Sequence, residues 1–273
     1  MDEVRERFNK AITAITARTN LKPTTLIILG SGLGEIVGSM DRRTDIPYSE
    51  IPHFRSGTVS GHKGLLSIGC IAETPVYCMQ GRNHYYEGCT DEDMRFPIQL
   101  FALLGVKNLI ITNACGSMNE NIRPGEMTLI TDHLNMTGRN PLVGRNFDEI
   151  GERFCDMSEP YDTELRNLAE TVATNAKINI KKGIYVGYLG PSYETKAEIK
   201  AYRNMGGDVI GMSTVPETIV ARHAGIRVLG IACVTNMATG ISESKLSHEE
   251  VLDRGQKIAK DLIMLLEGIL EKL

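Results

Sequence analysis

The feature that most constrains this chain is a regular alternation of short apolar runs with longer amphipathic stretches. The apolar runs are rich in branched residues, often end in glycine or a polar turn, and cover residues 25–29, 65–71, 76–79, 109–112, 127–131, 184–187, 209–211 and 228–234. Near-continuous hydrophobicity of this kind is typical of strands that are covered on both faces. Helical spacing is found between several of these runs, in residues 93–104, 162–173, 196–205 and 216–224. The alternation predicts an α/β fold with a mainly parallel or mixed sheet.

The two ends of the chain are predicted to be helical. Ser247 and Glu250 form an S-x-x-E capping pattern ahead of apolar residues that recur near the helical period. Residues 1–18 are charged and helix-patterned, and they lack the apolar segment of a secretion signal. Residues 135–162 lack clear periodicity, so we expect a long loop with a functional or interface role. With no repeat or linker composition, the whole of 1–273 is interpreted as a single domain.

Composition argues against several classes of protein. The net charge is −4 and basic residues form no block, so nucleic-acid binding is not expected. No apolar run approaches the ~18 residues of a membrane span. The six cysteines form no C-x-x-C pair, which favours reduced thiols in a cytoplasmic protein over disulfides or a zinc site. We therefore predict a cytoplasmic enzyme or binding protein without a metal.

Glycine-rich turns with polar side chains follow the apolar runs. Gly30-Ser31-Gly32-Leu33-Gly34 could cradle an anion with its backbone N–H groups and a hydroxyl, and His62 lies between glycines in a second turn. The first segment partly mimics a dinucleotide-binding fingerprint, although its spacing is G-x-G-x-G. Taken alone, a tight strand–helix connection and a solvated histidine explain the two turns equally well.

The segment from Met79 to Gly88 is the strongest single signal. It places Arg82, His84, Tyr86 and Glu87 directly after an apolar run. A guanidinium binds phosphate through two hydrogen bonds, and a histidine can add a donor that a carboxylate orients. Ligands of open α/β sheets bind beyond the carboxyl ends of the strands. The alternative interpretation is a salt-bridge cluster on the surface.

Four further segments bear polar groups where a strand is expected to end. They are residues 112–117 with Ala114, 190–195 with Tyr193 and Glu194, 211–217 with Met212 and Ser213, and 233–236 with Asn236. A hydroxyl near a helix start suits phosphate, and an asparagine offers both a donor and an acceptor to a purine edge. The alternative for the segments before helices is ordinary capping, with Thr195 as one N-cap.

Together and in this order, these segments resemble the trimeric purine nucleoside phosphorylases. The resemblance is carried by LGSGLG, GHKG, MQGRNHYYEG, TNACGSMN, GPSYET, GMSTVPE and VTN, and it covers nearly the whole chain. It implies one α/β domain with a mixed, partly barrel-like sheet flanked by helices, assembled as a homotrimer. It also implies phosphorolysis of inosine or guanosine to a free base and ribose 1-phosphate, with inorganic phosphate as co-substrate and no cofactor.

The resemblance also implies roles for individual residues. Phosphate would be bound by Ser31, His62, Arg82, His84, Ala114 and Ser213. The nucleoside would be bound by Tyr86, Glu87, Met212, Tyr193, Glu194, Asn236, His248 and Phe154, with Phe154 reaching a neighbouring subunit's sugar site. Asn236, Glu194 and His84 are the predicted catalytic residues. Tyr193 stands where phenylalanine is frequent, Cys115 replaces a more usual alanine, and residues 237–247 match poorly, which affects the placement of His248.

Four rival interpretations remain at this point. A 5′-methylthioadenosine phosphorylase would need an acidic residue where Asn236 stands. A phosphorylase with broader scope that accepts xanthosine is also compatible with the sequence. A nicotinamide-dependent dehydrogenase rests only on the glycines at 30–34, and a nucleoside-binding protein without activity would share the pocket.

Overall fold

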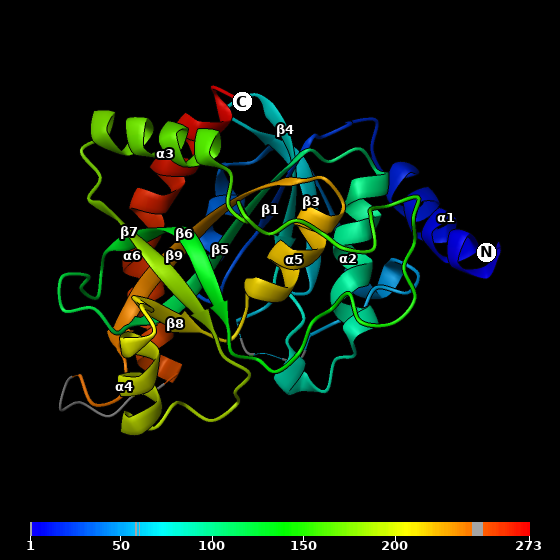
Figure 1. Cartoon of the computed structure of the whole chain (residues 1–273). Helices are drawn as coiled ribbons and strands as arrows, with labels where there is room; N and C mark the ends of the chain where they lie inside the picture. Colours follow the sequence, from blue (N-terminus) through cyan, green and yellow to red (C-terminus); the bar gives the residue numbers. More distant parts are fainter. Residues whose placement is uncertain (1, 58, 60, 242–247) are drawn as a thin grey trace.

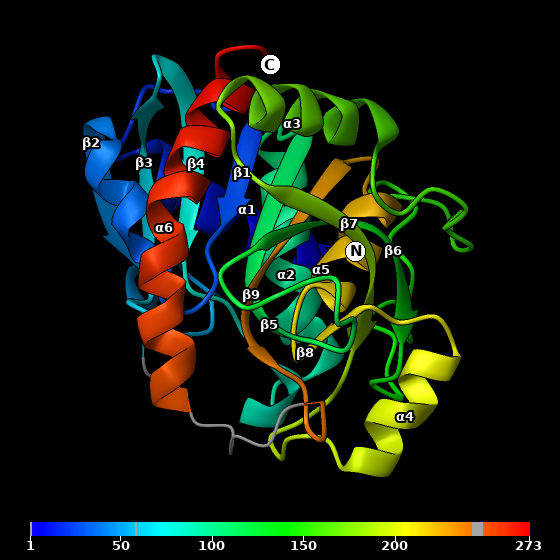
Figure 2. The same ribbon diagram turned by 90° about the vertical axis from the view of Figure 1, so that its left-hand side faces the viewer.

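The chain folds into one mixed β-sheet with helices on both faces (Figures 1 and 2). The computed structural model describes residues 2–57, 59, 61–241 and 248–273, and within these the side chains of residues 2 and 248–257 are not described. Within this part of the chain the strands are β1 (Thr25–Ile28), β2 (Asp41–Pro47), β3 (Leu65–Ile71), β4 (Thr74–Gln80), β5 (Asn108–Ser117), β6 (Met127–Asn135), β7 (Ile180–Gly187), β8 (Val209–Gly211) and β9 (Arg227–Met237).

Part of the sheet closes into a barrel. The strand order is β2-β3-β4-β1-β5-β8-β7-β6-β9, and β5 also pairs with β9, so that β5, β8, β7, β6 and β9 form a ring. The pairs β1–β4, β1–β5, β5–β9, β6–β7 and β7–β8 are parallel. The pairs β2–β3, β3–β4, β5–β8 and β6–β9 are antiparallel. The predicted mixed, partly barrel-like sheet is therefore confirmed.

Helices cover the sheet in two layers. They are α1 (Asp2–Thr16), α2 (Asp91–Leu103), α3 (Thr163–Asn175), α4 (Lys196–Asn204), α5 (Val215–His223) and α6 (His248–Leu270). One apolar cluster joins α1, α2 and α5 to one face, through residues such as Phe8, Phe101 and Val220. A second cluster joins α3 and α6 to the other face, with Leu165 and Leu266 packed against β1 and β9 (Figure 2). The sheet is thus buried on both sides, which explains its apolar strands.

Local signals explain where several helices begin. Thr90 and Asp93 form a capping box at α2, Asp162 caps α3, and Thr195 forms a capping box with Glu198 at α4. Each side chain accepts a hydrogen bond from a backbone N–H that the first helical turn leaves unpaired. The prediction that Thr195 is an N-cap is confirmed, whereas the predicted Ser247–Glu250 cap lies outside the described residues. Residues 136–162 contain no helix or strand, as the sequence predicted.

The sequence prediction was wrong or incomplete for several strands. β2 was missed because Asp41–Pro47 is an edge strand whose residues are largely exposed and charged. Charge on an edge strand hinders pairing with other chains and removes the apolar pattern that indicates a strand. β5 continues through residues 112–117, which were expected to turn away from the strand end, and β9 extends beyond its predicted run to Met237. No described helix is long and apolar enough to cross a membrane.

Candidate active site

One pocket lies where the carboxyl ends of β1, β4, β5 and β9 meet the end of β8. It is lined by Gly30, Ser31, His62, Arg82, His84, Tyr86, Asn113, Ala114, Cys115, Gly116, Tyr193, Glu194, Ile210, Gly211, Met212, Ser213, Thr235, Asn236 and Ala238. Of the predicted site residues whose side chains the structure describes, all line this pocket except Glu87 and Phe154. Segments far apart in the sequence therefore meet at one place, as expected for a sheet with parallel strands.

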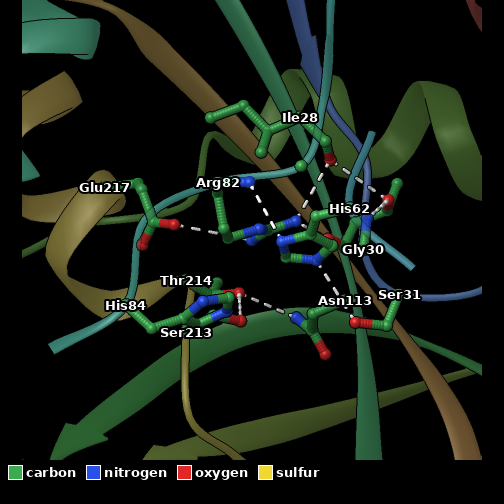
Figure 3. A network of polar contacts seen from close by, with 12 residues as sticks. Ile28, Gly30, Ser31, His62, Arg82, His84, Asn113, Ser213, Thr214 and Glu217 are labelled. Atoms are coloured by element: carbon green, nitrogen blue, oxygen red, sulfur yellow. Dashed lines mark hydrogen bonds and ion pairs between the residues drawn. The ribbon is translucent and has the colours of Figure 1, made fainter. Parts of the chain in front are cut away.

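Arg82 is the buried cation of this pocket and is only 3% exposed. Its Nη2 donates hydrogen bonds to the carbonyl oxygens of Ile28, at 3.3 Å, and of Thr112. Its Nη1 lies 3.6 Å from Oε1 of Glu217, which is itself buried (Figure 3). Burial lowers the pKa of Arg82, and the Glu217 carboxylate opposes that shift. The guanidinium is therefore held as a charged group by three protein partners.

The two histidines of the pocket stack beside Arg82. The ring centroids of His62 and His84 are 5.3 Å apart, and those of His84 and Tyr86 are 4.7 Å apart. Nδ1 of His84 is 2.9 Å from Oε1 of Glu87, and that oxygen also accepts the backbone N–H of His84 at 3.1 Å. Glu87 lies outside the pocket lining and fixes the His84 ring, so Nε2 is the nitrogen that a ligand can meet.

His62 is a neutral histidine in this arrangement. Burial, followed by electrostatic interaction with His84 and Arg82, lowers the pKa of His62 to about 3. Its Nδ1 accepts the backbone N–H of Arg82 at 3.4 Å, so the proton of the neutral ring lies on Nε2. Nε2 is 3.2 Å from Oγ of Ser31. His62 thus provides hydrogen bonds rather than a charge to the pocket.

Ser31, Ala114 and Ser213 complete the polar end around Arg82. Gly30 lets the turn after β1 approach β5, because a Cβ at this position would lie 2.8 Å from Cα of Asn113. Ser213 follows β8 and leads into α5, where the hydroxyl group is 3.3 Å from Oγ1 of Thr214. Hydroxyl groups and backbone N–H groups around a buried arginine form a suitable site for a tetrahedral anion.

The same pocket is lined by Tyr193, Glu194, Asn236 and Met212, and we call this part of it the Asn236 end. Tyr193 is 41% exposed, whereas Glu194 is 6% exposed and burial raises the pKa of its carboxyl group. Asn236 lies in β9, opposite an irregularity in the pairing with β5 at Cys115 and Gly116. Its Oδ1 accepts from Oγ1 of Thr235 at 2.9 Å, and its Nδ2 donates to the Met237 carbonyl oxygen at 3.1 Å. An aromatic ring, a carboxylate and an amide suit a flat heterocycle with hydrogen-bonding edges.

Phe154 is not part of this pocket. Phe154 is 89% exposed and lines a different surface hollow, with His133, Arg153 and Ile219 among its neighbours. Val143, which is 63% exposed, lines the same hollow, so two exposed apolar side chains gather there. α6 begins at His248, but the side chain of this residue lies outside the described residues.

Sequence reasoning missed Asn113, Thr214 and Glu217. Asn113 and Thr214 are hydrogen-bonded to each other although they are 101 residues apart, and Glu217 pairs with Arg82. All three lie inside segments that were singled out, but nothing local indicates which partner each one meets. Among the described residues no group of three or more His, Cys, Asp or Glu side chains could hold a metal ion.

Comparisons with known proteins agree with this geometry. The Phosphorylase superfamily model matches residues 24–271. The chain is 45% identical to Purine nucleoside phosphorylase 1 of Geobacillus stearothermophilus, covering 98% of both chains. It is 42% identical to the Bos taurus purine nucleoside phosphorylase, covering 94% of this chain and 91% of the relative.

A solved structure shows the same likeness. The purine nucleoside phosphorylase of Schistosoma mansoni in complex with inosine has a TM-score of 0.93 and 39% identity, over 98% of this chain and 96% of that one. The pocket, the fold and the relatives therefore lead to one conclusion: the chain belongs to the purine nucleoside phosphorylases of the phosphorylase superfamily.

Proposed function

We propose that this pocket catalyses phosphorolysis of 6-oxopurine nucleosides such as inosine and guanosine, with phosphate at the Arg82 end and the base at the Asn236 end. The observation that carries the proposal is the placement of Ser31, Arg82, His84 and Ser213 in the same pocket as Tyr193, Glu194 and Asn236. Phosphate would also meet His62 and the backbone of Ala114. Tyr86 and Met212 would contact the ribose between the two ends.

The reaction needs an anion on one face of the sugar and a stabilised leaving base on the other. Phosphate held by Arg82 and the hydroxyl groups attacks the anomeric carbon of an oxocarbenium-like sugar, and the bond to the purine breaks. The bond electrons move to the purine, where Asn236 stabilises the negative charge at N7 and O6. The carboxylate of Glu194 accepts a hydrogen bond from the N1–H group of the purine. No covalent intermediate with the enzyme is required, and we predict no cofactor or metal.

The same groups account for a preference between bases. A 6-oxopurine presents N1–H to Glu194, whereas adenine presents a lone pair there and leaves a buried carboxylate unpaired. A site built around such a hydrogen bond can reject the mismatched analogue by ~10⁴-fold. Adenosine is therefore predicted to be a poor substrate.

We further propose that residues 1–273 act as one domain within a homotrimer in the cytoplasm. Phe154 and Val143 are both strongly exposed on the long loop between β6 and α3, which supports a subunit interface there. Phe154 would reach the sugar site of a neighbour, and His248 would lie near the 5′-hydroxyl group. All of the free cysteines except Cys155 are buried, which fits a reducing compartment.

The central experiment follows hypoxanthine release from inosine with and without phosphate. Release that depends on phosphate and yields ribose 1-phosphate is expected. Phosphate-independent release would indicate a hydrolase, and binding without release would indicate a silent nucleoside-binding protein.

Analytical ultracentrifugation of the wild-type protein and of Phe154→Ala tests the assembly. The wild-type protein should sediment as a trimer. If Phe154 completes a neighbouring site, the Ala variant should raise the KM for inosine and leave the KM for phosphate unchanged. A monomeric wild-type protein with full activity would contradict the trimer.

A further inference from the structure

The chain makes an uncommon turn at Thr214, between the pocket residue Ser213 and the first residue of α5. Thr214 has φ of 75° and ψ of −50°, and the N–H of Val215 donates to the carbonyl oxygen of Ser213 at 2.8 Å. This combination defines a γ-turn of the strained kind with positive φ. Such a φ is rarer still for a β-branched residue, so the surrounding structure must impose it.

Asn113 holds Thr214 in this conformation. Thr214 is fully buried, and its Oγ1 accepts a hydrogen bond from Nδ2 of Asn113 at 2.9 Å (Figure 3). Asn113 is itself 2% exposed, and its backbone is packed against Gly30 so closely that a Cβ there would collide with it. Asn113 is also the neighbour of Ala114 in β5. The turn is therefore tied to the strand that lines the polar end of the pocket.

The γ-turn determines where the Ser213 hydroxyl group lies. It reverses the chain within three residues, so that Ser213 lines the pocket while Val215 already belongs to α5. Ser213 also lies within 3.3 Å of Oγ1 of Thr214. If Thr214 adopted an ordinary backbone conformation, the chain between the end of β8 and α5 would follow a different path, and the Ser213 hydroxyl group would move. Strained residues that their surroundings hold in place are concentrated at functional sites, where the strain serves preorganisation.

We propose that Thr214, clamped by Asn113, is a positioning residue for phosphate binding, and that it acts through Ser213. Thr214 does not line the pocket, so it has no direct contact to offer a ligand there. The proposal rests on the proposed function, in which Ser213 donates a hydrogen bond to phosphate. It predicts a defect in phosphate binding without a matching defect in nucleoside binding.

The test compares Thr214→Val with Thr214→Ser. The valine keeps the shape of the side chain and removes the acceptor for Asn113, whereas the serine keeps the hydroxyl group. We expect the KM for phosphate to rise about tenfold in Thr214→Val, in line with the loss of one buried hydrogen bond. The KM for inosine should stay within about twofold, and Thr214→Ser should be close to the wild type for both substrates.

Thr218→Val is the matched control, because Thr218 is a second fully buried threonine one turn further along α5 and does not line the pocket. It should leave the KM for phosphate unchanged. Thr214→Ala, which also lacks the hydroxyl group, supplies the same comparison if the valine variant does not fold. Equal changes in both KM values, or the same phosphate defect in Thr214→Ser, would show a general structural role and overturn the proposal.

Ser213→Ala separates this inference from the proposed function. A large rise in the KM for phosphate in Ser213→Ala, with none in Thr214→Val or Thr214→Ala, would sink only the role of Thr214. An unchanged KM for phosphate in Ser213→Ala would instead remove Ser213 from the phosphate site and overturn the proposed role of Thr214. The proposed function would fail separately, if hypoxanthine release from inosine did not depend on phosphate.

Discussion

At the Arg82 end of the pocket, polar side chains form hydrogen bonds and an ion pair with residues far away in the sequence. At the Asn236 end, they are hydrogen-bonded mainly to their sequence neighbours or are exposed to solvent. Arg82 is held by two carbonyl oxygens and Glu217, and His62 is held by Ser31 and the backbone N–H of Arg82. Asn236, in contrast, bonds to Thr235 and Met237, and Tyr193 is 41% exposed. The anion end is therefore held in place by contacts from distant parts of the protein, and fewer such contacts hold the base end.

This difference fits the chemistry of the two substrates. A small, highly charged anion is bound best by fixed donors in a buried site, because rigid dipoles need no rearrangement when charge develops. A flat purine offers a large surface and several hydrogen-bonding edges, so stacking can tolerate small displacements. We therefore expect substitutions at the anion end to affect both stability and activity, and those at the base end to affect mainly selectivity.

Arg82→Met should have the largest effect. It removes the cation that faces phosphate and leaves Glu217 buried without its partner. Phosphate-dependent kcat/KM should fall about 10³-fold, and the free energy of unfolding should decrease by about 3–5 kcal/mol. Steady-state kinetics at varied phosphate and chemical denaturation measure the two effects.

The double variant Arg82→Met with Glu217→Gln separates those two effects. Neutralising the orphaned carboxylate should recover most of the lost stability, while phosphate binding should stay impaired. If the double variant is as unstable as Arg82→Met alone, the buried pair is not what stabilises this end of the pocket.

Asn236→Asp should lower kcat/KM for inosine about 10²-fold, because the amide that stabilises the leaving base is lost. A protonated aspartate could accept from the 6-amino group of adenine and donate to N7, so the preference should move toward adenosine. The ratio of the two kcat/KM values is the measurement. An unchanged ratio would remove Asn236 from its assigned role at the base.

Glu194→Gln should lower kcat/KM for inosine about tenfold, since a neutral acceptor replaces a charged one. Burial raises the pKa of Glu194 above its ordinary value of 4.5, so the wild-type KM for inosine should increase as pH falls toward that raised pKa. The Gln variant should lack this acid limb in a plot of KM against pH. If the acid limb of the KM plot persists in Glu194→Gln, it reports the titration of another group.

The raised pKa of Glu194 also has a consequence for stability. The folded protein binds this proton more tightly than the unfolded chain, so the contribution of Glu194 to stability is most favourable below pH 4.5. It is lost as pH rises through the folded pKa. Glu194→Gln should therefore increase the free energy of unfolding at neutral pH and have little effect at pH 4, as denaturation at both pH values would show.

The contrast between the two ends also explains what the sequence could predict. Arg82, Ser213 and Asn236 were found because they stand at or near the ends of apolar runs and in motifs that resemble those of the phosphorylase family. The apolar runs alone predicted a mainly parallel or mixed sheet, and its barrel-like part was implied only by the resemblance. Thr214 and Glu217 were missed because their roles depend on partners that only the folded chain brings near them. β2 was missed for the opposite reason, since its exposed and charged residues carry no apolar pattern.

Tyr193→Phe should have the smallest effect, and it tests how well the base end of the pocket tolerates a substitution. The hydroxyl group is on a side chain that is 41% exposed, so its removal leaves no buried group without a partner. The aromatic ring, which would stack on the purine, stays in place. We expect kcat/KM for inosine to change by less than about threefold, since exposed substitutions away from buried networks cost little. A loss comparable to that of Glu194→Gln would mean that the hydroxyl group contacts the substrate, and that the base end is as tightly built as the anion end.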